Sequence, residues 1–147
     1  MFNLMKRKIA ILGSTGSIGK TTFNIIKKNS KKFNIVLLTT NKNIKEIVKQ
    51  AKKLKVKNII VSSIPHYNIL KKKKLKGVKI FNNLNSVNEI FKNKKIDYTM
   101  SAITGLVGLK PTLDVIKFSK TIAIANKESI ICGWNLIDKQ LKKYKTN

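Results

Sequence analysis

The chain contains little cysteine, proline and acid: one Cys, two Pro and six Asp plus Glu among 147 residues. The single cysteine, Cys132, excludes an internal disulfide framework and is typical of a reducing compartment. No apolar run reaches the length that spans a bilayer, and the opening MFNLMKRK is too short and too charged for a secretory signal. We therefore expect a cytoplasmic protein of one domain with no membrane partner.

Arginine is nearly absent although the chain is strongly basic. Of 32 basic residues only Arg7 is arginine, and the formal net charge is +26. Proteins that read nucleic acid generally use the bidentate fork of arginine, and these lysines are spread over nearly every predicted helix. Lysine, asparagine and isoleucine are all abundant and all have A/T-rich codons, so genome composition is the simpler cause. We expect no nucleic-acid partner, although the charge favours weak attraction of polyanions, including phosphorylated metabolites.

A glycine-rich turn, GSTGSIGKT, follows the first apolar run. A P-loop would need four residues between its two glycines. Counting back from Gly19 reaches Ser14 instead of glycine. Counting forward from Gly13 reaches Ile18. The spacing of Gly13, Gly16 and Gly19 matches instead a relative of the dinucleotide-binding turn.

Each glycine of such a turn has a physical role. Gly13 would permit the tight turn out of the strand, Gly16 would let the backbone approach a pyrophosphate, and Gly19 would let helix and sheet pack closely. A helix beginning near Ser17 would point its free N–H groups and positive dipole end at the phosphates. The turn, with a strand before it and a helix after it, therefore predicts a dinucleotide site.

Strand-like and helix-like runs alternate along the whole chain, with no internal repeat or linker. Such alternation is typical of buried parallel strands covered by helices. We predict an α/β fold, a Rossmann-type doubly wound parallel sheet in a single domain over 1–147, with ligands at the carboxyl ends of the strands. The predicted strands are 8–12, 34–40, 58–63, 78–81, 97–103 and 121–125, and the predicted helices are 17–29, 43–55, a short one from 65 to 74, 86–93, 109–118 and 128–144.

The ends of the predicted strands carry the other candidate groups. The second strand runs into Asn41, Lys42 and Asn43 with no carboxylate to accept a bond from a ribose 2′-hydroxyl, which favours NADPH over NADH. The fifth strand runs into SAITGLVG, whose small residues leave room for a cofactor. The sixth runs into the segment Asn126 to Glu128, which places an amide, a cation and an anion at the same edge.

Other chemically suggestive residues do not form a site in this interpretation. Tyr67 and Lys71 make a Y-x-x-x-K pair, but it falls in a lysine-rich helix after the third strand, too early for a short-chain dehydrogenase. His66, the single histidine, follows a proline and is expected to be exposed. Cys132 and Trp134 lie in the last predicted helix and are expected in the core.

With GSTGSIG, NKN and ANKES in this order on strand ends one, two and six, the chain resembles the 1-deoxy-D-xylulose 5-phosphate reductoisomerase family. The resemblance extends from Lys6 to Tyr144 and includes SAITGLVGLKPTL. It implies conversion of 1-deoxy-D-xylulose 5-phosphate to 2-C-methyl-D-erythritol 4-phosphate in non-mevalonate isoprenoid biosynthesis. It also implies a homodimer that uses NADPH and a divalent metal, Mg²⁺ or Mn²⁺.

The resemblance assigns roles to individual residues. Lys127 matches a residue that contacts the sugar phosphate substrate. Asn41 stands where many members have glycine; asparagine tolerates positive φ, so we expect the turn to be kept. Positions that match the family's NADPH contacts are Thr15, Gly16, Ser17, Ile18, Lys42, Asn43, Asn126 and Glu128.

The family's metal ligands, an Asp and a Glu in a D-S-E-H strand, have no counterpart in the chain. We therefore expect 1–147 to be the NADPH-binding domain only, truncated or excerpted, with no catalytic or metal-binding residue of its own and no activity alone. Three alternatives stay open. These are the cofactor domain of another NAD(P)-dependent reductase of the homoserine or semialdehyde dehydrogenase kind, a nucleotide-binding module without catalysis, and a basic nucleic-acid-binding protein.

Overall fold

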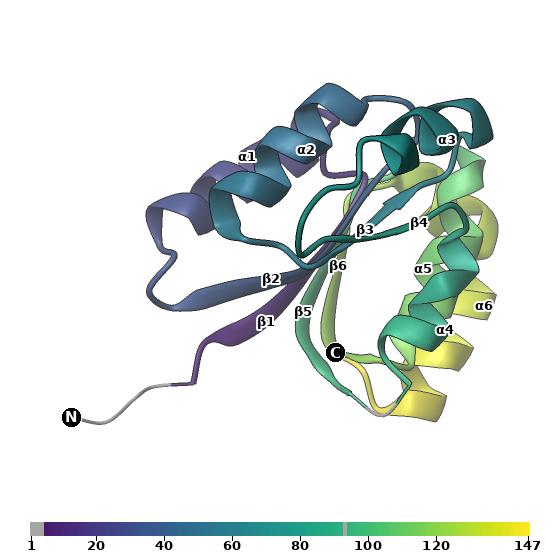
Figure 1. Cartoon of the computed structure of the whole chain (residues 1–147). Helices are drawn as coiled ribbons and strands as arrows, with labels where there is room; N and C mark the ends of the chain where they lie inside the picture. Colours follow the sequence, from purple (N-terminus) through teal and green to yellow (C-terminus); the bar gives the residue numbers. More distant parts are fainter. Residues whose placement is uncertain (1–4, 93) are drawn as a thin grey trace.

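The computed structural model describes residues 5–92 and 94–147, which form one twisted parallel sheet between two layers of helices (Figure 1). The strands are β1 (Arg7–Leu12), β2 (Phe33–Thr40), β3 (Asn58–Val61), β4 (Lys79–Phe81), β5 (Ile96–Ser101) and β6 (Ser119–Ile124). The helices are α1 (Ser17–Lys28), α2 (Ile44–Leu54), α3 (Ile64–Lys72), α4 (Val87–Ile90), α5 (Leu109–Ile116) and α6 (Lys127–Tyr144), with 3-10 turns η1 (Leu84–Ser86) and η2 (Leu106–Gly108).

The strand order is β4-β3-β2-β1-β5-β6, and every neighbouring pair is parallel. The chain winds outward from β1 to β4 on one side, then returns to place β5 on the other side of β1. The order reverses between β1 and β5, and ligands of open α/β sheets bind at such a switch point. The predicted doubly wound parallel sheet is confirmed.

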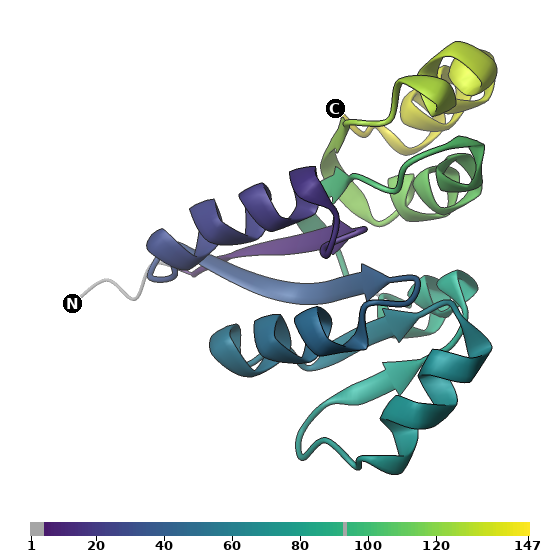
Figure 2. The ribbon, with the colours of Figure 1, turned by 90° about the horizontal axis from the view of Figure 1, so that it is seen from above.

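Both faces of the sheet are buried under helices. Successive side chains of a strand point to opposite sides, so each strand contributes to both cores. Ile9 and Ile11 of β1 belong to the core under α1, α2 and α3. Ala10 and Leu12 belong to the core under α4, α5 and α6. In Figure 1 α1 and α2 cover one side of the sheet and α4, α5 and α6 the other, and Figure 2 shows the same two layers from above.

The segment predicted as helix 86–93 differs from expectation. It is the 3-10 turn η1 followed by a single α-helical turn, α4. The Asn83 side chain accepts a hydrogen bond from Asn85 N–H and caps the 3-10 turn, which begins at the next residue, Leu84. Phe91 then ends α4, because its ring turns into the core beside Phe118, with ring centroids 6.0 Å apart. The end of the predicted helix, Asn93, lies outside the described residues.

One carboxylate clamps three strands at their amino ends. Asp97 of β5 accepts a hydrogen bond from Lys8 N–H of β1 at 2.8 Å and pairs with the Lys120 ammonium of β6 at 2.7 Å. The hydrogen bond from Lys120, the one from Lys8 N–H and their charges lower the pKa of Asp97 against a smaller opposing effect of burial. The clamp therefore stabilises the fold when Asp97 is ionised.

Replacing Asp97 with asparagine tests this clamp. Because the folded-state pKa lies below the ordinary value of 3.8, the contribution is complete at neutral pH and is lost as the pH falls through the lowered pKa. We expect Asp97→Asn to be less stable than the parent at pH 7, with a difference that shrinks at about pH 3 and below. Urea unfolding across this range measures it.

Asp138→Asn is the matched control, because Asp138 pairs with Lys142 on α6 without joining strands. It should change stability less at pH 7. A deficit in Asp97→Asn that stays constant from pH 7 to about pH 2 would contradict the clamp.

Candidate functional site

A cleft of about 590 Å³ opens at the carboxyl ends of β1, β2 and β5, at the switch point of the sheet. It lies between the glycine-rich turn, the end of β2 and the loop after β5. None of the side chains that line it is charged. The lining residues are Gly13, Thr15, Gly16, Thr39, Thr40, Asn41, Ser62, Leu84, Ala102, Ile103, Thr104 and Val107.

The turn after β1 is held tightly against the neighbouring strand ends. Gly13 has φ +77°, and a Cβ there would lie 2.7 Å from the Ala102 carbonyl oxygen. Gly13 N–H donates to Thr39 Oγ1 at 2.8 Å, and Ser14 N–H donates to the Thr39 carbonyl at 2.9 Å. The geometry matches the tight turn predicted for Gly13.

The other two glycines of the turn differ in their surroundings. A Cβ on Gly19 would overlap the Gly13 carbonyl oxygen and lie 2.6 Å from Ser14 Cα, so the absence of a side chain lets α1 pack on the turn. A Cβ on Gly16 would meet only the Gly13 carbonyl oxygen, at 3.6 Å, and Gly16 lines the cleft. A larger side chain at Gly16 would therefore project into open space.

Helix α1 begins at Ser17, as predicted, and its first turn is uncapped. Gly16 is the N-cap residue and supplies no side chain, and the first turn has no acidic residue. The backbone N–H groups of Ser17, Ile18 and Gly19 precede the first bond of the helix, from Lys20 N–H to the Gly16 carbonyl. Such unpaired donors at the positive end of a helix dipole form an anion site.

The loop after β2 is built differently from expectation. Positive φ outside glycine occurs among the described residues at Lys55, Lys74 and Lys145, so Asn41 does not use the left-handed conformation that we expected it to tolerate. Its side-chain Oδ1 instead accepts from Ser62 Oγ at 3.3 Å, which ties the loop to the end of β3. The turn at this position therefore does not require glycine.

The neighbours of Asn41 are placed for different tasks. Asn43 caps α2 by accepting from Glu46 N–H at 3.1 Å. Lys42 is exposed beside the cleft without lining it. Thr40 is buried, and its hydroxyl lies 2.7 Å from that of Thr15, so the end of β2 also fixes the glycine-rich turn.

Asn126 ties the end of β6 to the loop after β5. Its Nδ2 donates to the carbonyls of Ile103 and Gly105 at 2.6 and 2.7 Å, and its Oδ1 accepts from Ser129 N–H at 3.1 Å. Both amide hydrogens are used, and the residue is buried. Its side chain therefore holds a cleft wall in place, and sequence reasoning missed this role.

The cleft unites only part of the predicted site. Gly13, Thr15, Gly16 and Asn41 line it. The predicted residues that do not line it are Ser17, Ile18, Lys42, Asn43, Asn126, Lys127 and Glu128, all exposed except Asn126. Other lining residues were not predicted as site residues. Thr39 and Val107 belong to segments at strand ends that the sequence indicated as functional. No sequence pattern pointed to Ser62 or Leu84.

The residues set aside in the sequence do not form a second site. The ammonium of Lys71 lies over the Tyr67 ring, 5.3 Å from its centroid, and His66 Nδ1 lies 2.8 Å from Ser63 Oγ at the start of α3. The expected burial of Cys132 and Trp134 is wrong. Cys132 is exposed and Trp134 is 50% exposed, because α6 turns Ser129, Gly133 and Ile137 inward.

The described part of the chain offers no cluster of metal ligands. Within 5–92 and 94–147 no three or more His, Cys, Asp or Glu side chains gather as a metal ion would need. None of the helices described there combines the length and apolarity for crossing a bilayer.

Comparison with known proteins decides the family. The profile of the 1-deoxy-D-xylulose 5-phosphate reductoisomerase family matches residues 9–133. The chain belongs to this family. It is 62% identical over 143 residues to the reductoisomerase of Pelagibacter ubique, covering 95% of this chain and 37% of that protein. It is 37% identical over 141 residues to the Proteus mirabilis reductoisomerase, covering 94% and 36%.

Solved reductoisomerases have the same fold. The Zymomonas mobilis reductoisomerase in complex with NADPH superposes with a TM-score of 0.88 at 33% identity, over 97% of this chain and 38% of that one. A reductoisomerase in complex with NADPH, fosmidomycin and magnesium has a TM-score of 0.86 at 30% identity, over 96% and 35%. The chain thus spans a little over a third of the length of its reductoisomerase relatives.

The contrast between Gly19 and Gly16 is testable by substitution with alanine. Gly19→Ala should lower the free energy of unfolding by about 2 kcal/mol or more, because its Cβ would strike backbone that cannot move aside. Gly16→Ala, whose Cβ makes only an ordinary contact, should change it by less than about 1 kcal/mol. Urea denaturation of the two variants measures both values, and equal stabilities would refute the close approach of α1 to the turn.

Proposed function

We propose that residues 1–147 form the NADPH-binding domain of a 1-deoxy-D-xylulose 5-phosphate reductoisomerase. The whole enzyme would convert 1-deoxy-D-xylulose 5-phosphate to 2-C-methyl-D-erythritol 4-phosphate in isoprenoid biosynthesis. The observation that carries the proposal is the uncapped start of α1 beside an uncharged cleft at the switch point of the sheet. The NADPH named for the Zymomonas mobilis structure supports it.

In this proposal the pyrophosphate lies against the turn after β1. The N–H groups at the start of α1 would bond its oxygens, and Gly16 would admit them without a steric obstacle. The 2′-phosphate would meet Asn41, Lys42 and Asn43, where no carboxylate repels it. The full proposed set of cofactor residues is Gly13, Thr15, Gly16, Ser17, Ile18, Asn41, Lys42, Asn43, Asn126 and Glu128.

The start of α6 would serve the substrate side. Lys127 and Glu128 are exposed and follow β6, two strands from the glycine-rich turn. Lys127 would contact the sugar phosphate and Glu128 the cofactor. Asn126 would act through the loop after β5, because its amide already bonds the carbonyls of Ile103 and Gly105.

The protein's chemical share here would be positioning. NADPH when bound supplies the hydride, and this chain's residues would hold its phosphates and set its orientation at the strand ends. The donor set of the chain does not fit a divalent metal, since its described Asp, Glu, His and Cys residues form no cluster. We assign the metal to the part of the family's sequence that this chain does not span, with catalysis in a cytoplasmic homodimer.

Cofactor titration tests the proposed site. We expect the chain to bind NADPH more tightly than NADH by isothermal titration calorimetry, because the loop after β2 lacks a carboxylate. Gly16→Val should weaken NADPH at least about tenfold by placing a branched side chain in the cleft. Lys20→Ala, on the exposed side of α1, is the control and should bind normally. Unchanged affinity in Gly16→Val, or tighter NADH, would overturn the assignment.

We expect the chain alone to have no catalytic activity. Purified from a source free of host reductoisomerase, it should bind NADPH yet show no oxidation of NADPH with 1-deoxy-D-xylulose 5-phosphate, with or without Mg²⁺ or Mn²⁺, because the described residues offer no cluster of metal ligands. Absorbance of NADPH at its nicotinamide band follows the reaction. Metal-dependent turnover by the 147-residue chain would refute the division of labour.

A further inference from the structure

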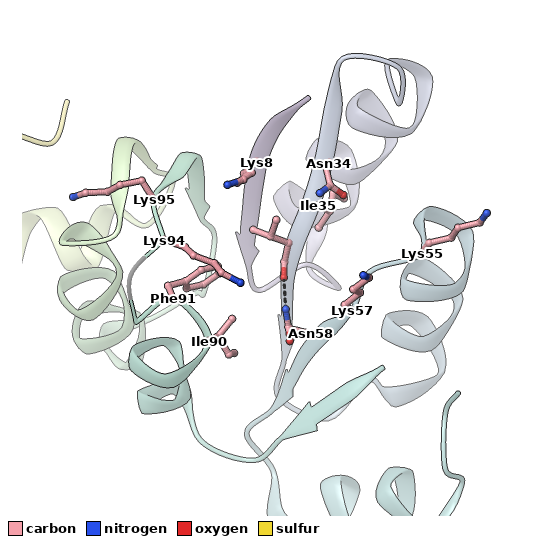
Figure 3. A pocket seen from close by; sticks show the side chains of 11 residues that line it. Lys8, Asn34, Ile35, Lys55, Lys57, Asn58, Ile90, Phe91, Lys94 and Lys95 are labelled. Atoms are coloured by element: carbon pink, nitrogen blue, oxygen red, sulfur yellow. Dashed lines mark hydrogen bonds between the residues drawn. The ribbon is translucent and has the colours of Figure 1, made fainter. Parts of the chain in front are cut away.

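A second hollow lies at the opposite edge of the sheet from the cofactor cleft, at the amino ends of the strands. It has a volume of about 300 Å³ and lies between β1, β2 and β3 on one side and the segment from α4 to β5 on the other (Figure 3). Its lining residues are Lys8, Asn34, Ile35, Val36, Lys55, Lys57, Asn58, Ile90, Phe91, Lys94 and Lys95.

All the charged side chains of the lining are cationic. Five of its eleven residues are lysines and none is acidic. In the same chain the cofactor cleft has no lysine among its twelve lining residues, so high lysine content alone does not account for the hollow. An adjoining hollow shares Phe91, Lys94 and Lys95 and adds Lys92 and Lys117, again without an acid.

The ammonium groups of this hollow lack carboxylate partners in the described structure. The ion pairs found in 5–92 and 94–147 join Asp114, Asp97 and Asp138 to lysines outside the lining. Asp97, which accepts from the Lys8 backbone, is engaged by Lys120. No lining lysine forms an ion pair among the described residues, although Lys8 lies close enough to Asp97 for its charge to lower the pKa of that carboxyl.

Lysine side chains surround the opening of the hollow, and the strands form its base. Lys94 reaches from the segment before β5 toward the strands, Lys8 points into the same gap, and Lys57 stands at the opposite rim, whereas Lys55 and Lys95 point away (Figure 3). Asn58 Nδ2 donates to the Val36 carbonyl at 3.1 Å, which fixes the strand edge beneath them.

We propose that this hollow binds a compact anion carrying several phosphate charges, of the diphosphate or triphosphate class. Ammonium groups act as mobile point charges suited to phosphate oxygens, and the volume admits a short phosphate chain. Phe91 is only 4% exposed, so the hollow offers no aromatic surface on which bases of a nucleic acid could stack. The site is independent of the proposed cofactor cleft, because the two lie at opposite ends of the strands.

Binding of tripolyphosphate to the 147-residue chain, measured by calorimetry at about 0.15 M salt, tests the proposal. With the start of α1 filled by saturating NADPH, we expect one tripolyphosphate per chain and at least tenfold weaker binding in the double variant Lys57→Gln/Lys94→Gln. The control Lys49→Gln/Lys139→Gln removes the same charge from two exposed lysines on α2 and α6 that line neither hollow, and should bind within twofold of the parent. Thermal melting confirms that both double variants fold.

The pattern of losses distinguishes a built anion site from general attraction to a basic protein. Equal loss of affinity in both double variants would overturn the proposal, since the net charge of the protein would then account for the binding. Absence of tripolyphosphate binding to the parent chain would overturn it as well. Competition between tripolyphosphate and NADPH would place the anion at α1 and also overturn it, whereas unchanged NADPH affinity supports two sites. A single-stranded oligonucleotide that binds more tightly than tripolyphosphate, and loses affinity in Lys57→Gln/Lys94→Gln, would show a nucleic-acid surface instead.

Discussion

The close approach of the turn after β1 to the ends of β2 and β5 is the constraint on which the proposed cofactor cleft depends. Gly13 faces the Ala102 carbonyl with no room for a side chain, and its N–H bonds Thr39. Gly19 brings α1 down onto the same turn. Since three strand ends and one helix start share these contacts, the free N–H groups of α1 are fixed before any ligand arrives, which is the preorganisation that phosphate binding rewards.

Local signals predicted the order of elements and the glycine-rich turn, because each depends on residues adjacent in sequence. The prediction of a helix over 86–93 was wrong because Phe91 ends the helix by packing on Phe118. The two residues are 27 positions apart, so the local hydrophobic pattern does not indicate their contact. The task of Asn126 was hidden for the same reason, since its partners Ile103 and Gly105 lie in another loop. Sequence alone indicates that strand ends are functional, but it does not show which of their side chains already form hydrogen bonds within the protein.

Exposure of α6 shows a further limit of sequence reasoning. Trp134 was expected in the core, yet it is 50% exposed, and Ile131 of the same helix is 77% exposed. The helix packs through Gly133 instead, where a Cβ would strike the Leu109 side chain. A small residue that lets two helices approach thus decides which face turns inward, and hydrophobicity by itself predicts the opposite face.

The two proposed anion sites, at opposite ends of the sheet, would attract anions by different physical means. At the carboxyl ends the cleft lining carries no charge, and attraction would come from backbone N–H groups and the dipole of α1, which are rigid and short in range. At the amino ends it would come from flexible lysines around a hollow. Rigid donors discriminate by geometry, whereas flexible ammonium groups discriminate mainly by charge. In this proposal the absence of lysine from the cleft lining leaves the selection of the cofactor to the rigid backbone donors, even in a strongly basic chain.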